Sequence, residues 1–402
     1  MLKNNLILRI HNYNIVSFGA LLGACSEDLL KQFSIFLWKT GHPFPEEALN
    51  GRLLFLYSFM MPHVEKAEAE FAVLKKAVAE SKSEAFFVVG GSHAFGIPEK
   101  MLNMGFDLVV TGESEAFFPD FLEKWLAGNP PKGIVKIQPG AVDLSHFPGF
   151  HKLIGYLPPV EISRGCRFGC AFCAVPRLYK GVVRYRSIDS IVSIARQYFQ
   201  IQPSRRRIKF LSSNSFGYGS IDGKTPNLKA IQELLTRLRT EGVSEISFGS
   251  FPSEVRPEFV TEEVMEIVSK FITNPAIVMG IQTGNEARLK AMGRGHNKEQ
   301  AVSAVKILSK FGFKAHVDFI IGYPNEKYAE QDELLTFMEE LVHKYQVKIH
   351  MHTFMPLPQT PWENLLASSI SQDSRKRLKA LASLGHLDGW WENQIHYSRK
   401  KS

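Results

Sequence analysis

Apolar strands and amphipathic helices alternate along most of this 402-residue chain, and that alternation points to an α/β fold. Near the start, residues 5–10, 53–59, 85–89 and 107–111 are nearly continuous apolar runs, as in parallel strands buried on both faces. A helix between the second and third runs carries its apolar residues on one stripe, which suits packing against a sheet. We therefore predict a doubly wound, Rossmann-like domain over residues 1–128.

The alternation resumes at residue 160, after a segment rich in proline and glycine (residues 129–158) that we interpret as a linker. Six strand candidates, each followed by a helical stretch, predict a partial (β/α)6 barrel over residues 159–365. Chemistry in such barrels takes place at the carboxyl ends of the strands. Residues 366–402 are predicted to form a short C-terminal helical tail. The strand candidates are residues 160–163, 208–212, 245–250, 276–282, 314–321 and 347–354.

Composition places the chain among ordinary globular proteins. Hydrophobic residues make up 45% of the sequence and charged residues 22%, which argues against wholesale disorder. No apolar run reaches the ~18–20 residues that span a bilayer, so we expect no membrane association. The net charge is +8, and its basic clusters are interpreted as solvated surface. Nucleic acid is therefore not expected among the partners.

Three of the four cysteines, Cys166, Cys170 and Cys173, are spaced C-x3-C-x2-C directly after the first strand of the predicted barrel. Thiolates this close in sequence can all bind one soft metal centre. Three ligands suit a [4Fe–4S] cube and leave one iron open, whereas a structural zinc site takes four protein ligands. No fourth ligand is evident nearby. A zinc site and a set of ordinary buried thiols are the alternatives to a cluster.

The cysteine spacing, with Phe172 just before the last cysteine, resembles the signature of the radical S-adenosylmethionine (SAM) superfamily. In that superfamily the open iron binds SAM, and an electron from the cluster cleaves SAM to give a 5′-deoxyadenosyl radical. The resemblance implies a flavodoxin- or ferredoxin-type electron donor. It also implies a cytoplasmic location, because thiols that bind a cluster must stay reduced.

Later segments resemble elements of that superfamily that contact SAM. Residues 211–219 stand where the family usually carries a Gly-Gly-Glu-like motif, and residues 280–286 resemble the segment near the ribose and carboxylate. Arg256 is a candidate partner for the SAM carboxylate, because a guanidinium binds carboxylates in a bidentate manner; a surface arginine is the alternative. The resemblance assigns cofactor contacts to Phe172, Ser212, Ser213, Asn214, Arg256, Gln282 and Thr283.

Two loops of the first domain, in residues 89–94 and 107–115, resemble those of cobalamin-binding domains fused ahead of radical SAM cores. Glycines let a flat macrocycle approach the backbone, at the strand ends where such sheets bind ligands. His93 is interpreted as a hydrogen-bonding loop residue rather than a cobalt ligand. A vestigial domain that no longer binds cobalamin is the alternative. The residues assigned to this site are Gly90, Gly91, Ser92, His93, Gly112 and Glu113.

The resemblance extends from about Asn5 to Pro361 and implies a cobalamin-dependent radical SAM enzyme. Methylation of an unactivated carbon, on a small-molecule or peptide substrate, is the reaction we predict. The alternatives are another radical reaction (cyclisation, rearrangement or RNA modification) and a non-enzymatic iron–sulfur or cobalamin sensor. RNA methylthiotransferases of the superfamily carry additional N-terminal cysteines, whereas only Cys25 precedes the motif here. The sequence identifies neither the substrate nor a general acid or base.

Overall fold

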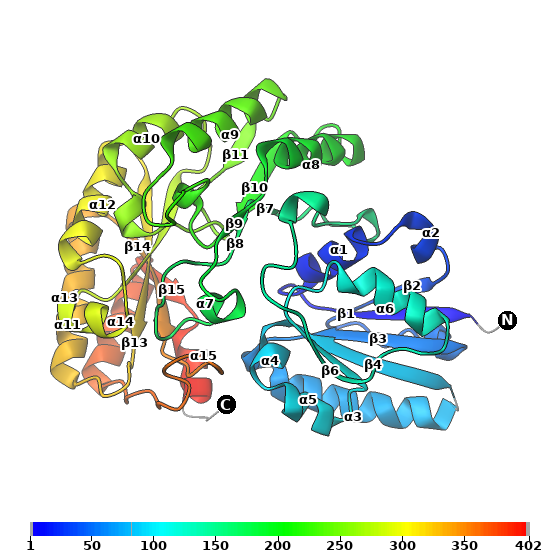
Figure 1. Ribbon diagram of the computed structural model, residues 1–402. Helices are drawn as coiled ribbons and strands as arrows, with labels where there is room; N and C mark the ends of the chain where they lie inside the picture. The colour runs from blue at the N-terminus through cyan, green and yellow to red at the C-terminus, as the bar shows by residue number, and fades with distance from the viewer. Residues whose placement is uncertain (1–2, 82, 399–402) are drawn as a thin grey trace. The chain divides into compact units, whose positions relative to one another are not determined.

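The computed structural model describes residues 3–81 and 83–398 and divides into two compact units, Met1–Pro158 and Pro159–Ser402. The segment interpreted as a linker belongs to the first unit. Each unit contains its own parallel sheet (Figure 1). Within the described residues, no helix combines the length and the apolar character that crossing a membrane requires.

The first unit contains a six-stranded parallel sheet in the order β2-β1-β3-β4-β5-β6, which confirms the Rossmann-like prediction. Four strands match the apolar runs in the sequence, whereas β2 and β6 do not. These two are edge strands with partly exposed side chains, so they lack the continuous apolar run of a buried strand. The strands are β1 (Asn4–Ile10), β2 (Ser34–Lys39), β3 (Arg52–Ser58), β4 (Glu84–Gly90), β5 (Leu108–Thr111) and β6 (Gly133–Lys136).

Because β6 lies within residues 129–158, the prediction that this segment is only a linker was wrong. β6 pairs with β5 over four residues. The segment has few apolar residues because an edge strand needs them on little of its surface. It also contains the short 3-10 helices η3 (Leu144–His146) and η4 (Lys152–Ile154), and η4 packs against α1 (Ile15–Gly23).

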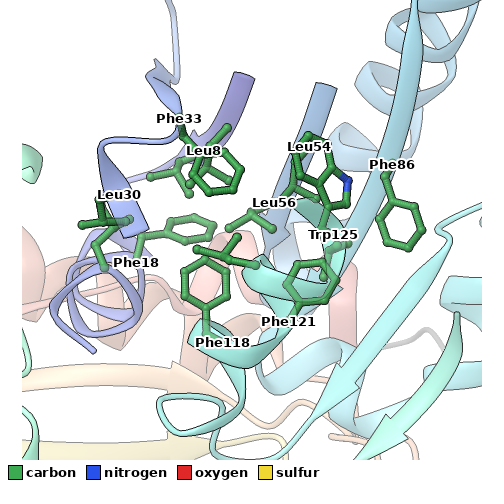
Figure 2. Packing of buried hydrophobic residues seen from close by; sticks show 14 of the residues in the cluster. Leu8, Phe18, Leu30, Phe33, Leu54, Leu56, Phe86, Phe118, Phe121 and Trp125 are labelled. Carbon is green, nitrogen blue, oxygen red and sulfur yellow. The ribbon is translucent and has the colours of Figure 1, made fainter. Parts of the chain in front are cut away.

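Apolar clusters cover both faces of this sheet. One contains residues of α1, α2 and α6, and Figure 2 shows Phe18, Phe118, Phe121 and Trp125 gathered over Leu54 and other strand residues. The opposite cluster contains α3, whose buried stripe is the one that the sequence predicts. The remaining helices of this unit are α2 (Glu27–Leu30), α3 (Val64–Ser81), α4 (Gly91–Gly96), α5 (Pro98–Met104) and α6 (Phe117–Leu126), with the 3-10 helices η1 (Glu46–Leu49) and η2 (Met61–His63).

The second unit contains two parallel sheets, ordered β11-β10-β7 and β12-β13-β14-β15. Two isolated parallel bridges, Ser212 to Ser253 and Val255 to Met279, link them through the segment after β11. The resulting strand order is that of the predicted partial barrel. The strands are β7 (Val160–Glu161), β10 (Arg207–Leu211), β11 (Glu245–Ser247), β12 (Ala276–Gln282), β13 (Lys314–Ile321), β14 (Lys348–Thr353) and β15 (Leu387–Gly389), and a small hairpin pairs β8 (Ser163–Arg164) with β9 (Arg184–Tyr185).

The C-terminal tail is not purely helical, because β15 pairs in parallel with β14 and extends the sheet beyond the six predicted strands. Three residues are too few to give a periodic signal in the sequence. The helices of this unit are α7 (Val175–Leu178), α8 (Ile188–Ile201), α9 (Leu228–Thr240), α10 (Glu262–Val268), α11 (Glu286–Ala291), α12 (Lys298–Lys310), α13 (Tyr328–Tyr345), α14 (Gln372–Ser383) and α15 (Trp391–Ser398), with the 3-10 helices η5 (Ser215–Gly217) and η6 (Pro257–Phe259).

The two faces of β13 and β14 carry different side chains. Phe319 of β13 packs edge-on against Phe337 of α13, with ring centroids 6.0 Å apart. Side chains alternate along a strand, so Asp318 and Ile320 point away from α13, into the barrel lumen. In Figure 1, α12 and α13 lie along the outer side of these strands. The lumen side is therefore the face on which chemistry is expected.

Candidate functional site

The three cysteines lie in one loop, residues 165–174, between the hairpin strand β8 and helix α7. We call this segment the cysteine loop. Cys170 is 3% exposed, and Cys166 and Cys173 are partly buried free thiols. At Gly165, which has a φ of 95°, a Cβ atom would stand 1.9 Å from the Val182 carbonyl oxygen. The sequence therefore needs glycine where the chain leaves β8 and enters the loop.

The loop is tied to the carboxyl side of β12 by its backbone and by an arginine. The amide of Ala171 donates to the carbonyl of Met292, 2.9 Å away. The guanidinium of Arg294 donates to the carbonyl of Gly280 on β12 and places Nη1 3.6 Å from the sulfur of Cys170. Nη1 of Arg256 lies 3.9 Å from the same sulfur. Two cations thus approach one thiol from two different segments.

The thiols influence one another and sit in an environment that disfavours free charge. Burial is the largest effect, and it raises the pKa of Cys166 and brings that of Cys173 to about 11. Neighbouring cysteines add to the rise in pKa at both sites, so the three thiols influence one another electrostatically. Binding to a metal centre would compensate for the cost of ionising these thiols.

Three thiols in one loop match the number of protein ligands that a [4Fe–4S] cube with one open iron takes. Within residues 3–81 and 83–398, no group of three or more His, Cys, Asp or Glu side chains is arranged to hold one metal ion. Around a single zinc ion the thiolates would converge to about 4 Å from one another, since each Zn–S bond is about 2.3 Å. In a cube each thiolate binds a different iron, so the sulfurs stand farther apart. The three thiols and the two nearby guanidinium groups are suited to such a centre.

A buried ion network lies beside the cysteine loop. Nε of Arg256 donates to Glu258 at 2.7 Å, and Nδ1 of His296 lies 3.4 Å from the other oxygen of that carboxylate. The guanidinium of Arg256 also stacks 3.5 Å from the ring centroid of Phe168. Burial alone would raise the pKa of Glu258, but His296 and Arg256 together lower it to about 2. Glu258 is therefore ionised at neutral pH and fixes Arg256 in place.

Most of the residues predicted to contact SAM lie around the cysteine loop, and their side chains have different environments. Ser213 and Asn214, after β10, line a solvent-open hollow of about 290 Å³ together with Cys166. Ser212 is hydrogen-bonded to Ser163, and Arg256 belongs to the ion network. The hollow is lined by Ser163, Gly165, Cys166, Arg167, Phe168, Val183, Tyr185, Ser213, Asn214, Gly217 and Gly223.

Gln282 and Thr283 are at the carboxyl end of β12 and do not line this hollow. The hydroxyl of Thr283, a 2% exposed residue, accepts the amide of Asn285 and so helps to start α11. Gln282 adopts a φ of 76°, and its carbonyl accepts the Tyr323 hydroxyl. Phe172 packs in an apolar cluster with Met292, Ile320, Tyr323 and Phe354, against which Trp362 and Ala367 also pack.

Sequence reasoning missed three residues of this region: Glu258, Arg294 and His296. Two of them lie in the segment Met292-Gly-Arg-Gly-His296, which in the sequence strengthens the resemblance of residues 280–286 to a SAM-contacting segment but assigns no role to the individual residues. Nothing in the sequence around Glu258 indicates its role, because its partners His296 and Arg256 are assembled by the fold.

A second group of candidate residues lies at the carboxyl edge of the first unit's sheet. His93 follows β4, is 5% exposed, and has no hydrogen-bond partner for either ring nitrogen among the described residues. Burial lowers its pKa to about 4, so the imidazole is neutral at pH 7. Its ring lies 5.6 Å from that of Phe59, at the end of the neighbouring strand. Gly90, Gly91 and Ser92 connect β4 to the helix that carries His93.

The loop after β5 has a structural role. Gly112 has a φ of 103°, and a Cβ atom there would stand 2.5 Å from the carbonyl oxygen of Ile137. Glu113 is buried, and its carboxylate accepts the backbone amide of Gly140 at 2.7 Å. The glycine is thus required by close packing, and the glutamate joins the loop to the segment after β6.

Sequence reasoning also missed an aromatic stack at the same edge. Tyr13, after β1, stacks on His63, after β3, with ring centroids 4.0 Å apart, and His11 also stacks on Tyr13, at 4.9 Å. The Tyr13 hydroxyl and Nδ1 of His63 are buried without a partner in the described part of the chain. The strand order reverses between β1 and β3, and sheets of this kind bind ligands at such a point. Unpaired polar atoms and flat rings at this edge fit a large planar cofactor such as cobalamin.

Comparison with known proteins identifies the barrel. Residues 160–338 match the model of the Radical SAM superfamily. The chain is 26% identical over 323 residues to the "Uncharacterized methyltransferase PH0819" of Pyrococcus horikoshii, and this match covers 73% of the chain and 66% of the relative. It is 25% identical over 301 residues to a tRNA-2-methylthio-N(6)-dimethylallyladenosine synthase of a Sulfurihydrogenibium species, covering 73% of the chain and 65% of the relative. The chain thus spans just under two thirds of the length of these two relatives.

A similar fold is present among solved structures. The radical SAM methyltransferase TsrM of Kitasatospora setae, solved with cobalamin and a [4Fe–4S] cluster bound, aligns with a TM-score of 0.67 at 14% identity. The alignment covers 90% of this chain and 77% of TsrM, so it extends over both units and shows a shared fold. Residues 160–338 therefore form a radical SAM region, and an N-terminal Rossmann-like domain precedes it.

Proposed function

We propose that this protein is a cobalamin-dependent radical SAM methyltransferase that acts on an unactivated carbon. The observation that carries the cobalamin part is His93, whose two ring nitrogens are buried without partners at the end of β4. Leaving a buried polar group unsatisfied costs about 1–3 kcal/mol. A ligand that hydrogen-bonds to these nitrogens would remove that cost, so the unsatisfied imidazole supports a bound partner.

Cys166, Cys170 and Cys173 would hold the cluster, and the carboxyl edge around His93 and Tyr13 would hold cobalamin. When bound, the cluster supplies the electron that cleaves SAM, and cobalamin carries the methyl group. Arg256 and Arg294 direct N–H groups at the sulfur of Cys170. These charges stabilise a thiolate there and orient the loop, since charge-assisted hydrogen bonds are the stronger kind.

Polar groups near the cysteine loop would bind SAM, and apolar groups there exclude water. Ser213 and Asn214 line the hollow beside Cys166 and would bind the polar groups of SAM, Asn214 through its side-chain NH2 because its Oδ1 accepts the backbone amide of Arg256. The packed apolar side chains of Phe172, Tyr323 and Phe354 lie next to the cysteine loop and exclude water from that side. Exclusion of water protects a reactive radical from side reactions.

The deciding experiment is anaerobic reconstitution of the full chain with iron, sulfide and cobalamin, followed by reduction in the presence of SAM. Mass spectrometry then measures 5′-deoxyadenosine and S-adenosylhomocysteine. Formation of both products supports the methyltransferase. Deoxyadenosine alone would replace it with another radical reaction, and the lack of either product with several reductants would refute the proposal.

Methylthio transfer is a second candidate, because one relative of this chain is a tRNA methylthio-synthase. That chemistry uses a second cluster held by further cysteines, and outside the cysteine loop this sequence contains only Cys25. Burial raises the pKa of Cys25 to about 12, in keeping with a packed thiol rather than a ligand. Iron analysis separates the two candidates: about four irons per chain fit one cube, and about eight would favour methylthio transfer.

A further inference from the structure

A polar layer crosses the lumen side of the second unit's sheet. In the register of the parallel strands, Asp388 of β15 pairs with His350 of β14, and His350 pairs with Asp318 of β13. Asp318 in turn pairs with Gly280 of β12. Residues paired in register point to the same face, so these side chains form one row. We call Asp318, His350 and Asp388 the lumen layer.

One end of the lumen layer is paired, and the other is not. His350 is 2.6 Å from Asp388, which also lies 3.5 Å from the ammonium of Lys348. In contrast, the Asp318 side chain has no hydrogen bond in residues 3–81 and 83–398, although the residue is only 9% exposed. Glu254 lies on the segment after β11, directly before Val255, which bridges to Met279 of β12. It is an electrostatic neighbour of Asp318 and likewise has no hydrogen bond to its carboxyl within that part of the chain. The carboxyl groups of Asp318, which is buried, and of Glu254, which is half-buried, thus lack hydrogen-bond donors among the described residues.

The unpaired carboxyl groups lie close to the cysteine loop. Ile320, two residues beyond Asp318 on the same face of β13, packs in the apolar cluster that includes Phe172 of that loop. Arg294 also connects the two places. Its guanidinium contacts both Cys170 of the loop and the carbonyl of Gly280, which is the register partner of Asp318. A molecule held by Asp318 would therefore lie directly beneath the cysteine loop.

We propose that Asp318 and Glu254, with His350 beside them, form a binding site for a protonated amine of the substrate. An ammonium group has three N–H donors, which can reach both carboxyl groups and the imidazole. An ammonium ligand would therefore supply the hydrogen-bond donors that the described residues do not provide to these carboxyl groups. This inference rests on the proposed function, because it gives the class of molecule on which the radical would act.

Electrostatics supports the same ligand class. Burial raises the pKa of Asp318 and of Glu254, and for Asp318 the neighbouring Glu254 raises it further. Ionising both carboxyl groups is costly, because burial and a neighbouring negative charge each disfavour the ionised form. A bound cation stabilises the ionised form of each. A carboxylate ligand would be repelled, and a neutral alcohol would offer a single donor.

The test uses the full chain with its cluster reconstituted anaerobically and three probes of equal length: n-butylamine, n-butanol and n-butyrate. Ligand-observed NMR at pH 7 measures each affinity. We expect the amine to bind at least tenfold more tightly than the alcohol, and butyrate not to compete with it. The isosteric variants Asp318→Asn and Glu254→Gln should each weaken amine binding at least fivefold.

The control variant is Glu299→Gln, which changes an exposed carboxylate in the first turn of α12 and should bind the amine as the wild type does. Equal affinity for amine and alcohol would overturn the inference, and so would unchanged amine affinity in both carboxamide variants. If one of these variants does not fold, by circular dichroism, the other decides. Wild-type protein that binds the amine but does not cleave SAM would overturn the proposed function and leave this inference standing. Cleavage of SAM without amine binding would overturn this inference and leave the proposed function standing.

Discussion

The cysteine loop and the carboxyl edge of the first sheet differ in the charge of the groups that would contact a ligand. Around the loop, ionised groups compensate one another: Arg256 pairs with Glu258, and Arg294 approaches the sulfur of Cys170. At the sheet edge, by contrast, the neutral side chains of His93, His63 and Tyr13 carry polar atoms that have no partner among the described residues. Burial lowers the pKa of His93 and of His63 and raises that of Tyr13 to about 12.

The difference matches the ligands that the two places would hold. A cluster bound by thiolates is a compact, negatively charged group, which is stabilised by fixed cations nearby. A planar cofactor has a large apolar surface and few polar contacts, so neutral rings suit it better than charges. Substitutions at the two places should therefore have different consequences.

Loss of a ligand thiol is expected to have the largest effect. Cys170→Ala should abolish SAM cleavage and reduce the iron content of the reconstituted protein, because two thiolates do not hold a cube. Cobalamin binding should persist if the two sites are as separate as they are in sequence. Iron analysis and product detection measure the effect. Cys25→Ser is the matched control, and retention of full iron content by Cys170→Ala would contradict the cluster assignment.

Breaking the buried ion network should cost the next largest amount. Glu258→Gln leaves Arg256 buried with no ionised partner, and removing one member of a buried pair costs about 3–5 kcal/mol. Denaturant unfolding measures this loss. Asp120→Asn, which breaks the exposed pair with Lys124, should cost less than about 1 kcal/mol.

The same carboxylate makes stability depend on pH. In the folded protein the pKa of Glu258 is about 2, below its ordinary value of 4.5. The ionised form therefore stabilises the fold at neutral pH, and that contribution is lost as pH falls from about 4.5 toward 2. The Glu258→Gln variant should lack this part of the acid sensitivity. An identical acid profile in wild type and variant would show that the network is not ionised.

Removing one of the two guanidinium groups at Cys170 should have a moderate effect. Arg294→Gln keeps the length of a polar side chain but removes its charge, so the reduced, more negative cluster should form less readily. We expect a lower reduction potential in a spectroscopic titration and SAM cleavage slowed about tenfold, the equivalent of ~1.4 kcal/mol. Arg237→Gln, on the exposed side of α9, should change neither property. An unchanged potential in Arg294→Gln would indicate that this guanidinium only holds Gly280.

The smallest change in folding stability is expected at the sheet edge, and there the substitution should stabilise the protein. His93→Leu removes two unsatisfied nitrogens, so the cobalamin-free protein should gain about 1 kcal/mol of stability. Its affinity for hydroxocobalamin, measured by absorbance titration, should fall about tenfold. His146→Leu, at an exposed position, is the control. A destabilised variant with unchanged cobalamin affinity would assign His93 to the core and would favour a vestigial domain.

Much of the fold was predictable because its signals are local. Strands β12 and β13 were predicted to the residue, and the buried stripe of α3 was predicted in full. Edge strands β2 and β6 were missed because partly exposed strands do not need a continuous apolar run. The cysteine loop was found from spacing alone, whereas Arg294 is separated from Cys170 by 124 positions in the sequence.

By itself, the sequence determined the alternation of strands and helices and the spacing of three thiols, because neighbouring residues define both. Only the tertiary structure decided which groups lack partners. His93 and Asp318 look like ordinary polar residues in the sequence, and each is unusual because the fold buries it while no side-chain hydrogen-bond partner for it lies within residues 3–81 and 83–398. Burial and pairing depend on segments far apart in the chain, and so no local pattern records them.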